Sequence, residues 1–288
     1  MCSVRALLLS ACALTTVASA QRGDDLLLRV GSFVRAASDQ LNGVIADETY
    51  RQELYAQPFQ GGTTRPRIRQ RSMRSEALFL FLRLQAGNAW MFVRNVVAVD
   101  GTPVPDSGER LDRLFEDSTI DAAAYLRQLQ RENARFDIGP VARTLGDPTF
   151  ALRYLAPQAQ ARFVFSRYGT ARLGDTRATK LRFSERRRPY IVTVNGMDGQ
   201  STGMMWIDEA DGSVLRTELH VALPSGRGAA AAITVDFQRD PDLRIWVPRR
   251  MSEQYYSIDG QMTGGSASYA NFHRFDATVR VLPPEAQH

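Results

Sequence analysis

The sequence predicts an α+β fold: a curved antiparallel sheet, forming an incomplete β-barrel, with an N-terminal amphipathic helix and a helical insertion against one face. Three observations support this prediction. An apolar stripe with helical spacing follows the N-terminus, strand patterns succeed one another from residue 161 onward, and helix signals fill the interval of about 106–158. With 288 residues, 44% hydrophobic and 23% charged, the chain has globular rather than disordered composition.

Residues 1–20 have the pattern of a secretory signal peptide, which predicts an exported protein of the periplasm or outer membrane. Arg5 precedes an apolar run over 6–14, and Ala18-Ser19-Ala20 is a small-residue cleavage site. Cleavage there leaves residues 21–288 as one domain without cysteine. Leu9-Ser10-Ala11-Cys12 also resembles a lipobox, which would instead leave a lipid anchor on Cys12. Both routes of processing remain open from the sequence.

The first elements of the domain are a helix and a pair of strands. An apolar stripe predicts a helix over about 24–45, and 48–55 is extended. Residues 58–75 are polar and contain Pro58 and Pro66, which predicts a loop leading into a strand. Strands are expected at 77–84 and 89–99, joined as a hairpin by the turn at Gly87-Asn88. The stripe consists of Leu27, Val30, Val34, Ala37, Leu41 and Val44.

The insertion of about 106–158 contains three predicted helices. Asp106 and Glu109 have the spacing of a capping box, and a second helix is expected over about 121–133. Asp147-Pro148 matches the N-cap and first position of a third helix. From residue 161 the pattern is an antiparallel meander with one polar and one apolar face. Its predicted strands are 161–168, 177–184, 189–195, 201–207, 213–223, 230–238, 244–257 and 266–281.

Motifs for catalysis, cofactors or metals are weak. The segment Gly199–Gly203 matches the nucleophile-elbow pattern around Ser201, but the residues after it predict a strand rather than the required helix. The segment Asp208–Gly212 is better explained as a hairpin turn than as a calcium loop. The three histidines are not spaced as metal ligands. We therefore predict no enzyme and no cofactor, although carboxylates distant in sequence could still meet as a hydrolase pair.

Four arginines alternate along an extended segment, which would place them on one side of it: Arg65, Arg67, Arg69 and Arg71. They could contact anionic lipid headgroups or an acidic partner. Alternatively, they form a solvated edge whose charges prevent pairing with other sheets. The net charge of +5 is too small to indicate nucleic acid binding.

Two resemblances add to this interpretation. The phrases Asn95–Val104, Gly203–Asp208 and Gly212–Glu218 resemble those of uncharacterised secreted bacterial proteins. The order of helix, strands, helical insertion and meander resembles the half-barrel of the outer-membrane lipoprotein-localisation carriers. That resemblance implies a concave apolar face, covered by helices, that holds acyl chains. No motif matches the partner-binding residues of those carriers, so none is transferred.

Two functions follow as hypotheses. The first is a periplasmic or outer-membrane-associated protein that binds a lipid or an acylated protein through its concave face. The second is a cell-envelope interaction protein that docks a partner through its outer face and the four arginines. For the first, the candidate lining is Leu78, Phe79, Leu80, Phe81, Leu82, Trp90, Phe92, Met204, Met205 and Trp206. The alternative is that these residues simply pack against the helices as core.

Overall fold

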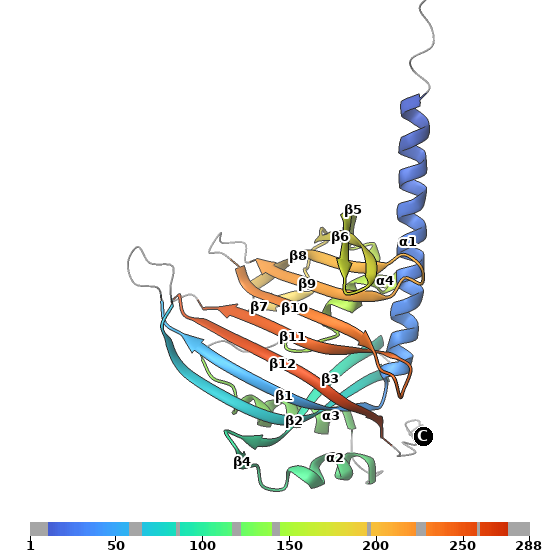
Figure 1. The fold of residues 1–288 in the computed structure, drawn as a ribbon. Coiled ribbons are helices and arrows are strands. Elements are labelled where there is room, and N and C mark those ends of the chain that lie inside the picture. Colours follow the sequence, from blue (N-terminus) through green and yellow to red (C-terminus); the bar gives the residue numbers. More distant parts are fainter. Residues whose placement is uncertain are drawn as a thin grey trace, which may run out of the picture.

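A computed structural model describes residues 11–57, 65–84, 87–116, 122–139, 145–194, 197–222, 229–257 and 260–275. It confirms the predicted fold class: a curved, open, antiparallel sheet of 12 strands with helices against it (Figure 1). In spatial order the main path is β4 (Thr102–Pro103), β3 (Gly87–Val99), β2 (Arg67–Leu84), β1 (Val44–Tyr55), β12 (Met262–Arg274), β11 (Trp246–Tyr256), β10 (Ala229–Arg239), β9 (Val214–Ala222), β8 (Met197–Asp208), β6 (Thr176–Glu185) and β5 (Phe163–Leu173); β7 (Val192–Val194) pairs with β8.

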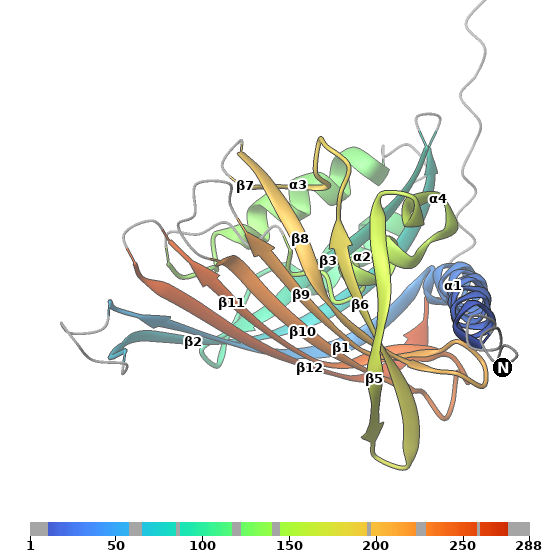
Figure 2. The same ribbon diagram turned by 90° about the horizontal axis from the view of Figure 1, so that it is seen from above.

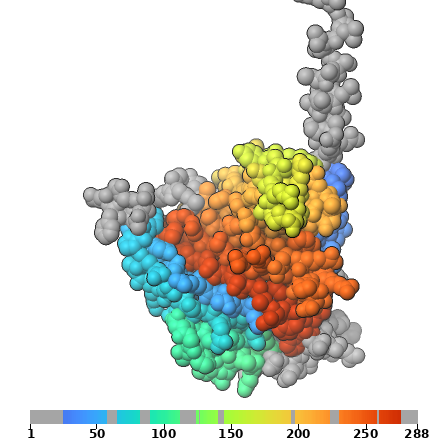
Figure 3. All heavy atoms as spheres, viewed as in Figure 1, coloured from blue at the N-terminus to red at the C-terminus, as the bar shows by residue number. Residues whose placement is uncertain are grey.

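The sheet is joined near its middle by the first and last strands. Tyr50 of β1 lies opposite Ala267 of β12, and on its other side it lies opposite Met73 of β2. Every other connection on the main path joins strands that are close in sequence. In Figure 3, β1, β12, β11 and β10 lie side by side on the convex face turned to the viewer. The β1–β12 pairing therefore unites the N-terminal hairpins with the C-terminal meander.

Helix α1 (Ala11–Leu41) crosses one end of the sheet, and its N-terminal part projects beyond the body (Figure 1). Its buried stripe includes Val30, Val34 and Leu41, as predicted. The predicted end at residue 45 is wrong. Gly43 adopts a φ of +74°, which ends the helix, and Val44 already begins β1.

The insertion divides around the edge of the sheet. Helix α2 (Ser107–Glu116) packs on the convex side, where Leu111 joins Ile45, Leu78 and Val93 in a separate apolar cluster. Helix α3 (Ala122–Ala134) lies along β3 (Figure 2). The 3₁₀ helix η1 (Phe150–Leu155) and the short α4 (Pro157–Gln160) pack against the concave face. The expected third helix is thus a 3₁₀ helix, preceded by a turn in which the Asp147 carboxylate accepts the Thr149 amide at 2.8 Å.

Side chains of η1 fill one half of the concave face. The ring of Tyr154 contacts the rings of Phe163 and Phe183, with centroids 4.6 and 5.6 Å apart. The Tyr154 hydroxyl and the Ser201 hydroxyl are hydrogen-bonded at 2.9 Å. Ser201 lies fully buried inside β8, so the match to a nucleophile elbow is a strand segment.

Candidate functional site

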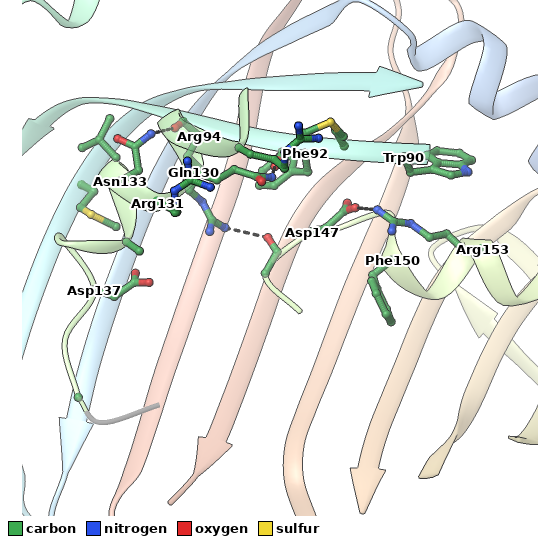
Figure 4. Close-up of a pocket in the computed structure, with 17 residues that line it drawn as sticks. Trp90, Phe92, Arg94, Gln130, Arg131, Asn133, Asp137, Asp147, Phe150 and Arg153 are labelled. Atoms are coloured by element: carbon green, nitrogen blue, oxygen red, sulfur yellow. Dashed lines mark hydrogen bonds and ion pairs between the residues drawn. The ribbon is translucent and has the colours of Figure 1, made fainter. Parts of the chain in front are cut away.

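The other half of the concave face contains a cavity of about 760 Å³ beneath α3. Strands β2 and β3, helix α3 and the segment before η1 surround it (Figure 4). The sheet supplies an apolar wall that includes Met73, Trp90, Phe92 and Val96, and Phe150 closes the cavity from η1. The ring of Phe92 packs on Phe79, with centroids 5.2 Å apart, so this wall continues into the core.

Arg94 forms the polar end of this wall. Its Nε donates to both carboxylate oxygens of Glu48 at 2.9 and 2.7 Å, and its Nη2 donates to the carbonyl of Gly146 at 3.1 Å. Its guanidinium lies 4.4 Å from the centroid of the Tyr50 ring. Burial, the largest single influence, lowers the pKa of Arg94, but Glu48 together with Tyr50, Tyr269 and Glu253 outweighs it and holds that pKa well above its ordinary value. Arg94 is therefore a fixed cation that ties β3 to β1 and to the segment before η1.

Helix α3 is fastened to the edge of the sheet through amide side chains. Gln130 donates to the carbonyl of Phe92 at 2.9 Å, and Asn133 donates to the carbonyl of Arg94. These bonds satisfy carbonyls that an edge strand would otherwise expose. Arg127, three residues before Gln130 on the same helix face, and Arg131, one turn after Arg127, also line the cavity.

Three further polar side chains of the lining interact with other residues of the protein. Arg153 forms an ion pair with Asp147, and Asp137 accepts a hydrogen bond from Gln52 at 3.0 Å. Figure 4 shows Asp147 and Arg153 on the opposite side of the cavity from Asn133. Within the described part of the chain, no carboxylate forms an ion pair with Arg127 or Arg131, and both side chains are exposed.

A second cavity of about 510 Å³ lies between α1, α4 and the sheet. Val34, Ser38, Phe81 and Pro157 contribute to its lining. Trp90 lines both cavities, so its indole stands between them. The Phe81 and Trp90 rings pack edge to face with centroids 5.5 Å apart.

The structure divides the predicted lining between two faces of the sheet. Trp90 and Phe92 line the larger cavity, and Phe81 lines the smaller one. Phe79 and Met205 also face the concave side but are buried in core. The convex side carries Leu78, Leu80, Met204 and Trp206. Leu82 lies in β2, but its side chain is outside the described residues.

The four alternating arginines do not form one patch. Arg71 faces the concave side and donates to the carbonyl of Phe136 at 2.7 Å. Beyond a shift in register between Leu54 and Tyr55, Arg67 pairs with Glu53 at 2.9 Å. Arg65 donates to the Gly260 carbonyl at 2.5 Å. Arg69 remains exposed. A role for these side chains in anion or partner contact stays a prediction.

Sequence reasoning missed the polar part of the cavity. Arg94 interrupts an apolar strand, which signals a special environment, and Arg127 and Arg131 have i, i+4 spacing. Neither signal indicates that α3 would lie over this part of the sheet. In the described residues, no three His, Cys, Asp or Glu side chains group to hold a metal ion. No helix of that same part has the length and hydropathy of a membrane span.

No protein-family model matches this chain, and no curated protein matches it in sequence. Solved structures with a similar fold include an outer membrane lipoprotein-sorting protein domain from Vibrio parahaemolyticus, 14% identical with a TM-score of 0.39 over 89% of this chain and 94% of that one. A DUF1329 family protein from Desulfovibrio piger is 9% identical, with a TM-score of 0.34 over 86% and 95% of the two chains. The structure of the Pseudomonas aeruginosa MucA/MucB complex is 11% identical, with a TM-score of 0.22 over 86% of this chain and 99% of that one.

An outer membrane lipoprotein-sorting domain is thus among the solved structures that this chain resembles. Likeness of this degree concerns the fold alone. Function is therefore inferred from the cavity.

Proposed function

We propose that this chain is an exported binding protein of the cell envelope that holds an acyl chain of a lipid or lipidated protein, without catalysis. The observation that carries the proposal is the cavity of about 760 Å³ under α3, with Trp90, Phe92 and Phe150 on its walls. Its volume is within the range of about 300–1,000 Å³ that is usual for small-molecule sites.

The chemistry of the walls suits an acyl chain. Aromatic rings and the flexible thioether of Met73 can adapt to an irregular apolar ligand. Each CH₂ group buried there contributes about 0.8 kcal/mol to binding. Because η1 fills the other half of the concave face, the ligand would be confined to the space beneath α3.

Export is supported by the signal-peptide pattern of residues 1–20. Retention at a membrane through a lipid on Cys12 is the alternative outcome of processing. Intact-mass measurement of the protein from its own host distinguishes the two, because lipidation at Cys12 retains residues 12–20 and adds acyl mass.

Native mass spectrometry of the protein purified from its host without detergent tests the proposed ligand. We expect a bound species with the mass of a lipid. Ala134→Trp places an indole in the cavity from an exposed position on α3 and should abolish that species. Ala124→Trp, on the same helix but outside the lining, should retain it. A wild-type protein free of lipid would contradict the proposal.

A further inference from the structure

The cavity is amphipathic, and its charge is unevenly compensated. Of its four arginines, Arg94 is paired with Glu48 and Arg153 with Asp147. Arg127 and Arg131 line the same cavity, and among the described residues neither has an ion-pair partner. The one other acidic side chain of the lining, Asp137, is hydrogen-bonded to Gln52. Among the described residues that line the cavity, positive charge is therefore in excess.

The positions of Arg127 and Arg131 are unfavourable for the helix by itself. Like charges separated by four residues repel one another on a helix surface. An anionic group between the two guanidinium groups would remove that repulsion and accept charge-assisted hydrogen bonds from both. Each guanidinium group presents forked N–H donors that suit a phosphate group.

We propose that the ligand of this cavity is an anionic lipid whose phosphate-bearing head is bound by Arg127 and Arg131 while its acyl chain lies against Trp90 and Phe92. This inference rests on the proposed function and specifies the class of lipid. The apolar wall comes from β3, and the two arginines come from the helix above it, so the two parts of such a lipid would meet complementary surfaces.

Calorimetric titration with two soluble lipids tests the inference. Lysophosphatidylglycerol and lysophosphatidylcholine with the same acyl chain differ in net charge but not in the chain that they bury. We expect the wild-type protein to bind the anionic lipid about tenfold more tightly, a difference of about 1.4 kcal/mol. Raising the salt concentration from 50 to 500 mM should reduce this preference, because the arginines are exposed.

The double variant Arg127→Gln/Arg131→Gln should lose the preference and keep its affinity for lysophosphatidylcholine. The control Arg74→Gln/Arg250→Gln removes the same charge from exposed positions on the convex face and should keep the preference. Circular dichroism checks that both variants are folded, and the salt series on the wild-type protein provides a measurement that depends on no variant.

The outcomes separate the two proposals. Equal affinity of the wild-type protein for both lipids would show that Arg127 and Arg131 do not select an anionic headgroup. The proposal that the cavity binds an acyl chain would be unaffected. Binding of neither lipid would overturn both. Inorganic phosphate serves as a third probe: if it binds as tightly as lysophosphatidylglycerol, the site recognises a free anion, and the lipid assignment fails.

Discussion

Arg94 is the residue on which the candidate site depends most. Its side chain joins Glu48 of β1 to the carbonyl of Gly146, and its own carbonyl accepts a hydrogen bond from Asn133 of α3. Three separate parts of the chain therefore meet at one residue. Glu48 is buried, with 1% of its surface exposed, so the pair is shielded from water.

Replacing Glu48 should destabilise the protein, because a buried charge without a partner raises the free energy of the folded state. We expect Glu48→Leu to lower the free energy of unfolding by about 3–5 kcal/mol, because Arg94 is left buried without its carboxylate. Adding Arg94→Met to that variant should recover part of the loss. Urea denaturation of the two single variants and the double variant measures the coupling. Strictly additive effects would show that the pair contributes nothing as a pair.

Glu185 makes stability depend on pH. Its Oε1 accepts the Ile191 amide at 2.9 Å, and its side chain is fully buried. Burial raises the pKa of Glu185, which the Ile191 amide and Arg162 oppose only in part. The folded state therefore holds a proton on this group more tightly than the unfolded state. Its contribution to stability is greatest at low pH and is lost as the pH rises from the ordinary value of 4.5 through the raised pKa.

Glu185→Gln should remove the loss of stability at rising pH, because glutamine does not ionise. Its side-chain carbonyl can still accept the Ile191 amide. We expect the melting temperature of the variant, relative to wild type, to increase between pH 4 and pH 8. Glu218→Gln, on the convex face, serves as the control and should follow the wild-type profile. Parallel profiles for wild type and Glu185→Gln would contradict the prediction.

At the scale of elements, β8 lies so close to its neighbours at Gly203 that no larger side chain fits there. Gly203 of β8 lies opposite Phe183 of β6, whose ring covers it. A Cβ atom at this position would lie 1.9 Å from the Glu218 carbonyl oxygen and 2.7 Å from the Phe183 ring. The strand patterns alone do not indicate this requirement, because it depends on both neighbours of β8.

Gly203→Ala should therefore displace β8 from its neighbours. We expect a loss of about 1–3 kcal/mol or more in the free energy of unfolding, as for overpacked cores. The matched control is Gly108→Ala in α2, where a Cβ atom would meet nothing within 4 Å. That change should stabilise the protein by about 0.5–1 kcal/mol, since alanine favours helices over glycine. Denaturant titration of both variants tests the contrast.

The sequence predicts elements well where local patterns determine them. Alternation of apolar and polar residues identified the strands of the meander, including β9. The turn at Asp208–Gly212 is confirmed by the Asp208 carbonyl, which accepts the Gly212 amide at 2.9 Å. The loop expected over 58–75 is in part wrong, since β2 begins at Arg67 and pairs with β1 from Arg67 to Phe79. The polar residues at 67–70 are exposed, and β3 pairs with β2 only from Met73 onward.

At the scale of the whole molecule, long-range packing decides which face of each strand meets the helices and where α3 lies, and the sequence alone does not predict either. Alternation separates Leu78 from Phe79, but it does not reveal which of them faces the helices. The cavity also depends on α3 lying along β3, and the side-chain amides that hold it there have no distinctive pattern. Trp90 and Phe92 were therefore predictable as apolar strand residues, and their cationic neighbours on α3 were not.

The pairing of β1 with β12 makes the sheet one cooperative unit. A chain that ends at residue 257 lacks β12 and leaves β1 and β11 with unpaired edges. We expect that chain to aggregate or to lack cooperative unfolding, whereas a chain that ends at residue 275 should be folded. Size-exclusion chromatography and thermal melts distinguish these outcomes. A monomeric, cooperatively folding chain ending at 257 would show that the two parts of the sheet are independent.

The pairing of β1 with β12 also determines when the sheet can be completed during synthesis of the chain. Residues 44–55 emerge early during synthesis, but their partner strand spans residues 262–274, so the sheet cannot be completed until almost the whole chain has been made. Until then β1 has β2 but not β12. The polypeptide would thus remain incompletely folded throughout translation, which is the condition in which a chain can be threaded through a membrane pore. For the exported protein proposed above, this topology would postpone completion of the sheet until both of its ends have crossed the membrane.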